Sequence, residues 1–438
     1  MIKTRNVIRY KWRDIPALLQ TPLGRLQFWE GIYYRFWPFF FHLASLYRRA
    51  ICPNTRIVSV VGSFGKSTTL RAVRNTLGLQ FQRLYLRNSW TLVARAVLRI
   101  RPHDRHAAIE VGIDGKGQMA LYARMIRPDV TVVASIGSEH NRSLGTLEVT
   151  RSEKAEMVRI LPESGIAVLN GDDQNVLWMK SQTRARVITF GMNDMNDVRA
   201  SDIRLDWPEG TRFKLHLDGK TYDMKVRLLG RHMVYPILAA AAVAHAEGFP
   251  PDRFLQSLED LAPTPGRIQP VHLQNGAIIL RDDFKSSFET IETALDVFSE
   301  IPAQRKIVVL GEVSEPPGSQ GPIYWKIGER VAKIASRAVF IGGNFQRYAA
   351  GAVRGGLPKH SIINAQRNVS NAVKALQDDL GTGDVVLIKG RDTQRLERIA
   401  LALAGQTVRC DISFCDAKVR CDLCPILKLG WKGRRIVI

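Results

Sequence analysis

The chain has 438 residues, of which 45% are hydrophobic and 24% charged, values typical of a globular protein with two or three domains. Its 63 Lys and Arg residues against 41 Asp and Glu give a net charge of +22, which favours nucleic acid, an anionic membrane surface or a polyanionic substrate as partner; a basic surface without a specific partner is the simpler alternative. Only 5 cysteines are present, which excludes a secreted disulfide scaffold.

Residues 1–55 form an N-terminal lead in which basic side chains flank an aromatic run, and we expect it to be helical. The run at 28–43 is interrupted by Glu30, Arg35 and Pro38, whereas a helix that spans a bilayer needs about 20 mainly apolar residues. The pattern therefore favours either a helix that lies in a membrane interface or one that packs on the next domain through its aromatic side chains. The lead has no signal-peptide cleavage site, which indicates a cytoplasmic protein, at the inner face of the membrane if the lead binds lipid.

A nucleotide-binding loop is predicted directly after the lead. The β-branched run at 57–61 indicates a buried strand, and the glycine turn that follows leads into Lys66, Ser67 and a helical pattern. In such a loop the backbone N–H groups and the helix N-terminus bind phosphate oxygens, the lysine reaches the terminal phosphates and the serine hydroxyl binds Mg²⁺. The candidate nucleotide-binding residues are Gly62, Ser63, Phe64, Gly65, Lys66, Ser67 and Thr68.

Alternating strands and helices follow the loop, which indicates a doubly wound parallel sheet. Buried strands are predicted at 107–111, 130–136 and 165–170, antiparallel hairpins within 196–228, and an Ala-rich helix at 237–246. After a linker at 263–267, a second α/β pattern has strands at 277–280, 306–310, 338–341 and 385–388. We therefore expect an α/β protein with a central P-loop domain at 56–262 and a Rossmann-like domain at 263–408.

A Cys-rich tail is predicted at 409–438. Cys410, Cys415, Cys421 and Cys424 have the spacing C-x₄-C-x₅-C-x₂-C, which makes them candidate ligands of a structural Zn²⁺ ion or of an iron–sulfur cluster. The alternative is a short domain that contains four reduced cysteines.

The order of motifs from about residue 56 to residue 404 resembles the Mur ligase superfamily, and within it the branch of UDP-N-acetylmuramoyl-tripeptide–D-alanyl-D-alanine ligases. The phosphate loop is the first match. The other matching segments are 108–112, 128–140, 144–156, 169–173, 230–232, 266–267, 282–284, 310–315 and 383–391. The resemblance implies ATP-driven ligation, in which Lys66 and Arg267 offset phosphate charge and Asp282 contacts the nucleotide.

The resemblance also implies a magnesium site. Ser67, Glu110 and His140 would hold Mg²⁺, and Lys154, if carbamoylated, would bridge a second Mg²⁺ ion. Taken singly, Glu110 can be a surface acid and His140 a hydrogen-bonded core histidine. Their place at strand ends within this order of motifs favours metal binding.

The sequence also departs from the family pattern. The lead is too short for the domain that binds the UDP-sugar in relatives, so we expect a substrate other than UDP-muramoyl-tripeptide. Met233 and Pro236 stand where the family has asparagines at the adenine site, and Lys285 and Ser287 replace asparagines after the aromatic position Phe284. We therefore expect diverged pockets for adenine and for the acceptor.

These patterns together predict an ATP- and Mg²⁺-dependent ligase that joins a carboxylate donor to an amino acid or small peptide through an acyl phosphate. The alternative is a nucleotide-dependent scaffold, without ligase activity, at a membrane or on nucleic acid, and it is motivated by the charge of +22 and the aromatic lead. The sequence has no RNA-stacking signature, so nucleic acid is the weaker of these two partners.

Overall fold

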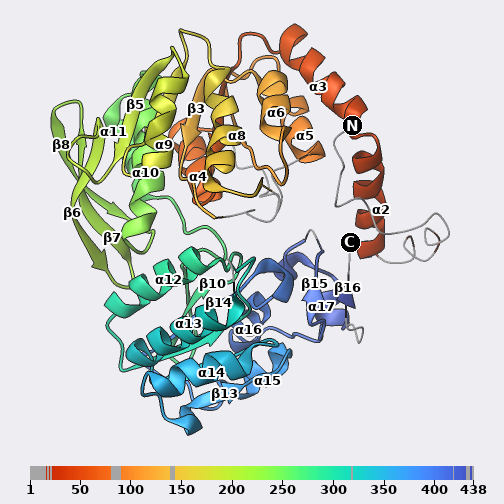
Figure 1. Ribbon diagram of the computed structural model, residues 1–438, viewed down its shortest axis with the longest axis vertical. Coiled ribbons are helices and arrows are strands. Elements are labelled where there is room, and N and C mark those ends of the chain that lie inside the picture. The colour runs from red at the N-terminus through yellow and green to blue at the C-terminus, as the bar shows by residue number, and fades with distance from the viewer. Residues whose placement is uncertain are drawn as a thin grey trace. The chain divides into compact units, whose positions relative to one another are not determined.

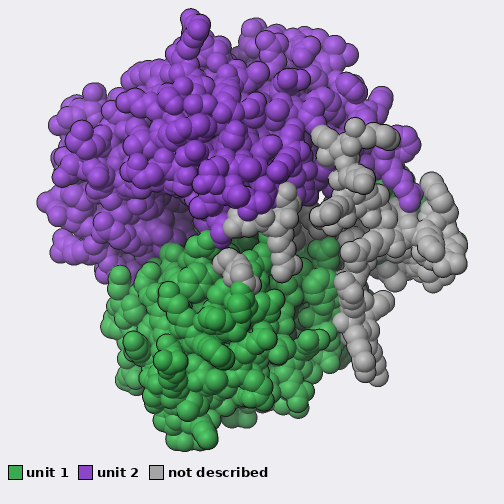
Figure 2. Space-filling view, viewed as in Figure 1, with its two compact units in different colours: residues 1–32, 263–438 green, residues 33–262 purple. Residues whose placement is uncertain are grey.

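The computed structural model describes residues 16, 19, 22–79, 90–138, 144–316, 319–417, 419–430 and 435–436. The chain forms two compact units (Figure 2). One comprises Tyr33–Ala262, and the other comprises Pro263–Ile438 together with Met1–Ile32. The division between the units lies at Ala262 and Pro263, and the predicted limits of the four domains stay predictions.

An eight-stranded sheet forms the centre of the first unit (Figure 1). The strands from β2 to β6 pair in parallel, and β7 and β8 continue the same sheet as antiparallel hairpins. In spatial order they are β2 (His106–Glu110), β1 (Arg56–Val61), β3 (Val130–Val133), β4 (Ile166–Asn170), β5 (Arg186–Gly191), β6 (Val198–Asp206), β7 (Gly210–Leu217) and β8 (Lys220–Val226). Strands β1, β3 and β4 are almost wholly buried, as their β-branched and aliphatic runs predict.

The helices of this unit form two groups. The first contains α4 (Lys66–Thr76), α10 (Val234–Ala246) and α11 (Pro251–Glu259), which contact one another; the second contains α3 (Trp37–Ala50), α5 (Thr91–Leu98), α6 (Gln118–Ile126) and α8 (Leu147–Arg159). Helix α10 is buried along most of its length, and its alanines allow close packing against α4. The short helix α9 (Gln174–Leu177) follows β4.

The N-terminal lead contains α2 (Pro22–Arg35) and α3. Helix α3 contacts α5 and α6, and its Trp37 ring lies 5.3 Å from that of Trp90 and 6.1 Å from that of Tyr122. The predicted packing of the lead on the next domain is therefore correct for one face of α3. Across the described residues, every helix is too short or too polar to cross a lipid bilayer.

The buried side chain of Arg48 links α3 to the rest of the first unit. Its guanidinium donates to the carbonyl oxygens of Ile126 at 3.0 Å and Cys52, and pairs with the Asp129 carboxylate at 3.2 Å. Asp129 in turn accepts from the backbone N–H of Ile57 at 2.8 Å, at the start of β1. One buried charge pair thus joins the lead, α6 and the strand that precedes the phosphate loop.

The second unit has a six-stranded sheet whose strands are parallel except for β9 at one edge. Its spatial order is β13 (Ile362–Asn364), β12 (Arg337–Phe340), β11 (Arg305–Leu310), β14 (Asp384–Lys389), β10 (Ile278–Asp282) and β9 (Gln269–His272). Its longer helices are α12 (Phe288–Glu300), α13 (Gln320–Ile334), α14 (Phe345–Arg354), α15 (Val369–Lys374) and α16 (Glu397–Leu403). This arrangement confirms the predicted Rossmann-like domain.

The tail adds a small parallel pair, β15 (Phe414–Cys415) and β16 (Arg435–Ile436), with α17 (Ile426–Leu429) beside it. The predicted strand at 130–136 is too long at its end, because β3 stops at Val133 and the next residues leave the sheet to bond with the phosphate loop. The doubly wound sheet, the hairpins within 196–228 and the Ala-rich helix are all confirmed.

Replacing Arg48 with Met should destabilise the first unit by about 3 kcal/mol, because the partly buried Asp129 carboxylate and the carbonyl groups that Arg48 contacts lose their charged donor. Arg49→Met is the matched control, since Arg49 is exposed and its loss should change the free energy of unfolding by about 0.5 kcal/mol or less. Urea unfolding followed by tryptophan fluorescence measures both. Equal free energies of unfolding for the two variants would contradict the stabilising role of Arg48.

Candidate active site

Two glycines shape the phosphate loop between β1 and α4. Gly62 has φ +149°, and a Cβ built on it would lie 3.1 Å from the backbone nitrogen of Ser135. Gly65 has φ +80° and occupies the left-handed N-cap position of α4, which begins at Lys66. Both positions favour glycine, because a side chain there would be strained or would collide with the neighbouring strand end. The glycines thus let the loop turn directly into the N-terminus of α4, and the binding of phosphate there stays a prediction.

The loop is bound to the segment that follows β3. The backbone N–H of Ser63 donates to the Ser135 carbonyl at 2.7 Å, and that of Phe64 donates to Ser135 Oγ at 2.9 Å. The Gly137 N–H donates to Ser63 Oγ at 2.8 Å. A Cβ on Gly137 would lie 2.4 Å from the Phe64 ring, so this glycine gives the ring its space.

Sequence reasoning missed Ser135 and Gly137. The signal that could have found them is their position: they follow β3, which pairs in parallel with β1, so the two strands end at the same edge of the sheet. A small polar residue and a glycine after such a strand are suited to bonding the loop.

Lys154 lies at the phosphate loop, although 87 residues separate it from the end of that loop at Ser67. Helix α8 buries the Lys154 side chain, and its Nζ donates to Ser63 Oγ at 2.8 Å. Lys66 Nζ donates to the carbonyl oxygens of Gly62 and Ser63, at 2.8 and 2.9 Å. The structure thus brings Lys66, Lys154 and Ser63 together at one edge of the sheet.

Glu110 and Ser67 lie on neighbouring elements at the same edge. Glu110 is the last residue of β2, in register with Val60 of β1, and α4, which carries Ser67 in its first turn, contacts β2. A carboxylate and a hydroxyl are oxygen donors of the kind that Mg²⁺ prefers, so these two residues fit the ion by chemistry. His140, the third predicted ligand, is outside the described residues, and the role of all three stays a prediction.

The acids after β4 brace the loop segments. Asp173 Oδ2 accepts from the backbone N–H of Ile136 at 2.7 Å, and Asp173 also caps α9. Asp172 Oδ2 accepts from the Tyr235 hydroxyl at 2.9 Å, and burial together with this hydrogen bond raises the pKa of Tyr235. These side chains therefore hold β4, α10 and the segment after β3 in place.

Met233, which stands in place of a family asparagine, is buried.

Arg267 and Asp282, the other predicted site residues, belong to the second unit. The Arg267 guanidinium lies over the Phe284 ring, 4.6 Å from its centroid, which fixes the cation near the end of β10. Asp282 Oδ2 accepts from Lys389 Nζ at 2.7 Å, at the ends of the paired strands β10 and β14. Burial lowers the pKa of Lys389, and the Asp282 carboxylate opposes that shift.

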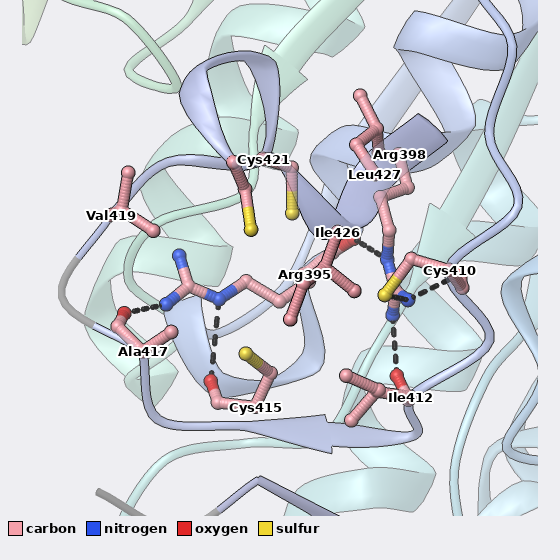
Figure 3. A pocket seen from close by; sticks show the side chains of 11 residues that line it. Arg395, Arg398, Cys410, Ile412, Cys415, Ala417, Val419, Cys421, Ile426 and Leu427 are labelled. Atoms are coloured by element: carbon pink, nitrogen blue, oxygen red, sulfur yellow. Dashed lines mark hydrogen bonds between the residues drawn. The ribbon is translucent and has the colours of Figure 1, made fainter. Parts of the chain in front are cut away.

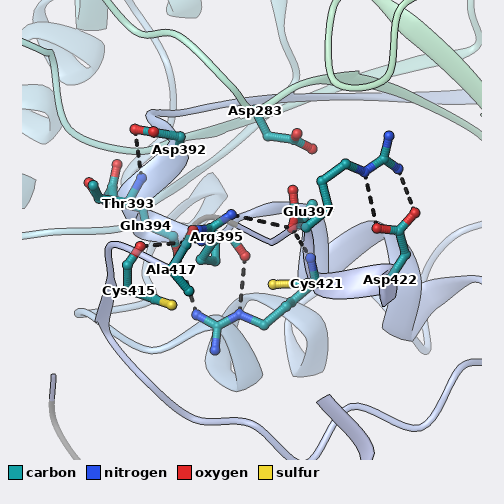
Figure 4. Close-up of polar contacts among 12 residues, drawn as sticks. Asp283, Asp392, Thr393, Gln394, Arg395, Glu397, Cys415, Ala417, Cys421 and Asp422 are labelled. Carbon is teal, nitrogen blue, oxygen red and sulfur yellow. Dashed lines mark hydrogen bonds and ion pairs between the residues drawn. The ribbon is translucent and has the colours of Figure 1, made fainter. Parts of the chain in front are cut away.

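The four tail cysteines line one pocket together with Arg395 and Arg398 (Figure 3). The Arg395 guanidinium donates to the carbonyl oxygens of Cys415, at 3.2 Å, and Ala417, and Arg398 donates to the carbonyl oxygens of Cys410 and Ile412, at 2.8 and 2.6 Å. Glu397 accepts from the backbone N–H of Cys421 at 2.6 Å (Figure 4). The tail is thus attached to the second unit by charged side chains and backbone groups.

The predicted zinc site at Cys410, Cys415, Cys421 and Cys424 is not supported. Within the described part of the chain, no group of three or more His, Cys, Asp or Glu side chains is placed to hold a metal ion. Cys415 packs in the apolar core of the tail, and Cys421 packs against Leu401 and Leu427. Burial raises the pKa of the Cys421 thiol. None of the five described cysteines is in a disulfide, and Cys415 and Cys421 pack as small apolar side chains; the four reduced cysteines stay the alternative interpretation of the sequence.

The fold and the loop indicate a class of protein, the nucleotide-binding α/β enzymes. The phosphate loop follows a strand of a parallel sheet, and a separate Rossmann-like domain follows along the chain. Profiles of known families make the assignment specific. Residues 60–244 match the Mur ligase middle domain, and residues 266–391 match the domain described as Mur ligase, glutamate ligase domain. The chain belongs to the Mur ligase family. Members of this family are ATP-dependent ligases that form amide bonds, and this is the class of enzyme to which the chain belongs.

Curated relatives carry the name UDP-N-acetylmuramoyl-tripeptide–D-alanyl-D-alanine ligase. The Escherichia coli protein is 29% identical over 301 residues, which are 68% of this chain and 66% of the relative. The Bacillus subtilis protein is 25% identical over 362 residues, 82% of this chain and 77% of the relative. The MurF ligase of Thermotoga maritima, solved in complex with ADP, has the same fold, with a TM-score of 0.72 and 21% identity over 84% of this chain and 83% of that structure.

Replacing Ser63 with Ala should lower the free energy of unfolding by about 1 to 3 kcal/mol, because the buried Lys154 Nζ and the half-buried Gly137 N–H both lose the Ser63 hydroxyl as acceptor. The variant should also bind ADP more weakly than the native chain. Ser181→Ala is the control, since the Ser181 hydroxyl is exposed and bonds only within its own turn. Thermal unfolding with and without ADP tests this, and an unchanged response to ADP would contradict the role of Ser63.

The cysteines should respond to substitution according to their burial. Cys415→Ser and Cys421→Ser should each cost about 1 to 3 kcal/mol, because a hydroxyl replaces a thiol that is 9% or 8% exposed, whereas Cys410→Ser and Cys424→Ser should cost less. A chelator should leave the melting temperature unchanged. Equal losses in all four variants, with stoichiometric zinc in the purified chain, would restore the zinc interpretation.

Proposed function

We propose that this chain condenses a carboxylate donor with the amino group of an amino acid or small peptide, at the expense of ATP and through an acyl phosphate. One observation carries the proposal: Lys154 of α8, buried within the Mur ligase middle domain, is hydrogen-bonded to Ser63 in the phosphate loop. Phosphoryl transfer depends on cations and metal ions that neutralise the charge of the transferred group. The position of Lys154 beside the loop suits it to hold such an ion once its amine has been converted to an anionic carbamate.

The reaction balances in two steps. A carboxylate oxygen of the donor attacks the γ-phosphorus of ATP, the bond from that phosphorus to the β,γ-bridging oxygen breaks, and ADP leaves. The acceptor amine then attacks the acyl carbon, phosphate leaves with the former carboxylate oxygen, and the nitrogen loses a proton. Activation is needed because a carboxylate and an amine do not condense unaided in water.

Each candidate site residue of the first unit has a role in this reaction. Lys66 and the loop N–H groups bind the phosphates of ATP, and they offset the charge that spreads over the transferred group. Ser67 and Glu110 would hold Mg²⁺, which neutralises phosphate charge when bound. We further propose that the Lys154 amine, after loss of a proton, adds to CO₂ and releases a second proton to form a carbamate, an anion that would help to hold a second Mg²⁺ ion.

The second unit contributes a cation and an ion pair. Arg267, held over Phe284, is suited to binding a phosphate group, because its guanidinium is planar, permanently charged and already oriented. Asp282 keeps one carboxylate oxygen on Lys389 Nζ, which leaves the other oxygen to contact the nucleotide.

The substrates proposed here differ from those that the relatives' names state. The Escherichia coli relative is named for a tripeptide linked to UDP-N-acetylmuramic acid and for D-alanyl-D-alanine. In this chain Lys285, which replaces an asparagine, accepts the Lys389 Nζ hydrogen bond at its backbone carbonyl, and Ser287 occupies the N-cap position of α12. These changes support a different acceptor, and we propose a donor carboxylate on another carrier, such as a lipid or a polymer.

The purified chain should release ADP only when a donor and an acceptor are both present, and Lys66→Ala should reduce that rate by about 10² to 10³-fold. Lys180→Ala is the matched control, because Lys180 is exposed in the same unit, and its activity should be unchanged. A screen of carboxylates against amino acids and small peptides, including UDP-muramoyl-tripeptide with D-alanyl-D-alanine, identifies the pair. Full turnover by Lys66→Ala would exclude the mechanism.

Isotope transfer separates the acyl phosphate from other routes. A donor whose carboxylate carries ¹⁸O should pass one ¹⁸O atom to the released phosphate, because that oxygen attacks the γ-phosphorus. Phosphate without ¹⁸O would contradict the acyl phosphate. ATP binding without ADP release under any substrate pair would favour the nucleotide-dependent scaffold instead.

A further inference from the structure

Helix α3 is apolar on two opposite faces, and only one of them is covered. The inner face, with Trp37, Ala44 and Tyr47, packs against the core of the first unit, and the Tyr47 hydroxyl donates to the Ile100 carbonyl at 2.6 Å. The buried Arg48 fixes the helix further, as described above. The orientation of α3 on its unit is therefore set by its inner face.

The outer face presents large apolar side chains to solvent. Phe36, Phe39, Leu43 and Leu46 recur at the spacing of one helical face, and their exposed fractions are 57%, 61%, 40% and 63%. Ile51, just past the end of the helix, is 47% exposed. A continuous exposed apolar strip on an otherwise well-packed unit is the kind of surface that binds a partner or a membrane.

The charged residues near this strip indicate which kind of partner it binds. No Asp or Glu occurs between residues 31 and 55, nor in α5 or α6, the two helices against which α3 packs. Five arginines are exposed on these elements and in the segments that follow them, Arg49, Arg99, Arg101, Arg124 and Arg127, and one partly exposed acid, Asp104, accepts from the Arg101 backbone N–H. An apolar strip on elements whose exposed charges are mainly basic complements a surface that is apolar inside and anionic at its boundary.

We propose that the outer face of α3 docks on the surface of an anionic phospholipid bilayer, with Phe36, Phe39, Leu43 and Leu46 inserted at the level of the headgroups. The arginines at the end of α3 and on its neighbours bind the lipid phosphates. A second copy of this chain is a poorer occupant, because it would place arginines against arginines. This surface lies outside the ligation chemistry, so the proposal stands or falls separately from the proposed function.

The test is binding of the full chain to sedimented vesicles, made either of phosphatidylcholine alone or with about a third phosphatidylglycerol. We expect binding to the anionic vesicles, weakened by salt, and little binding to the neutral ones. Phe39→Ser combined with Leu46→Ser should weaken binding at least about tenfold, because both side chains are exposed in the free chain and buried in lipid only on docking.

The matched control is Ile160→Ser combined with Met195→Ser. Ile160 and Met195 are apolar residues of the same unit with exposed fractions of 40% and 89%, and neither lies on α3. This variant should bind vesicles as the native chain does. Failure of the native chain to bind anionic vesicles at low salt would overturn the proposal, as would equal loss of binding in the two variants.

A Phe39→Trp variant reports insertion directly. Brominated lipids should quench its fluorescence more than that of the native chain, whereas Ile160→Trp should show no additional quenching. No additional quenching in Phe39→Trp would overturn the docking mode. So would a serine variant of α3 that loses self-association or RNA binding while vesicle binding is unaffected.

Discussion

The Ser63 hydroxyl is the point on which the first unit depends. It accepts from Lys154 Nζ at 2.8 Å and from the Gly137 N–H at 2.8 Å, and it donates to the Gly137 carbonyl at 3.1 Å. Helix α8 and the end of β3 thereby meet at the loop. Lys154 is buried and Gly137 half-buried, so these hydrogen bonds restrict the geometry of the loop.

Ion pairs hold the other unit together at the corresponding strand ends. Arg281 binds both oxygens of Asp283, at 2.8 and 3.1 Å, and Lys389 binds Asp282. Burial raises the pKa of Asp283, and the bidentate Arg281 cation opposes that shift. The result is a rigid edge from which Arg267 is presented over Phe284.

Much of this architecture is predictable from the sequence, because buried parallel strands are continuous aliphatic runs and because the phosphate loop has a local signature. Residues 57–69 are sufficient to predict strand, loop and helix. The end of β3 is not predictable in the same way. The sequence does not indicate that the strand ends at Val133 rather than at the apolar residue Ala134 that follows. The structure shows Ser135 and Gly137, just beyond this end, hydrogen-bonded to the phosphate loop.

Contacts between distant residues are the other limit. The spacing of the four tail cysteines suggested metal ligands, but spacing along a chain does not reveal that Arg395 and Arg398 enter the same pocket and bond the backbone between the thiols. The position of Lys154 could be inferred only through resemblance to a family, since nothing local to α8 indicates that its side chain reaches Ser63. Membrane binding of the lead and its packing on the next domain were likewise predicted as alternatives, whereas α3 packs on its unit with one face and leaves the other exposed.

The attachment of the tail bears on how this chain is made on the ribosome. Arg395 and Arg398 are buried, and their acceptors include carbonyl groups of residues 410–417. Until that stretch has left the exit tunnel, the guanidinium groups of Arg395 and of Arg398 in α16 lack those acceptors, so the second unit completes its core only after residues 410–417 have emerged. The first unit ends at Ala262 and can fold while the following residues are translated. Because synthesis runs from the N-terminus, the unit that contains the phosphate loop can fold before the second unit does.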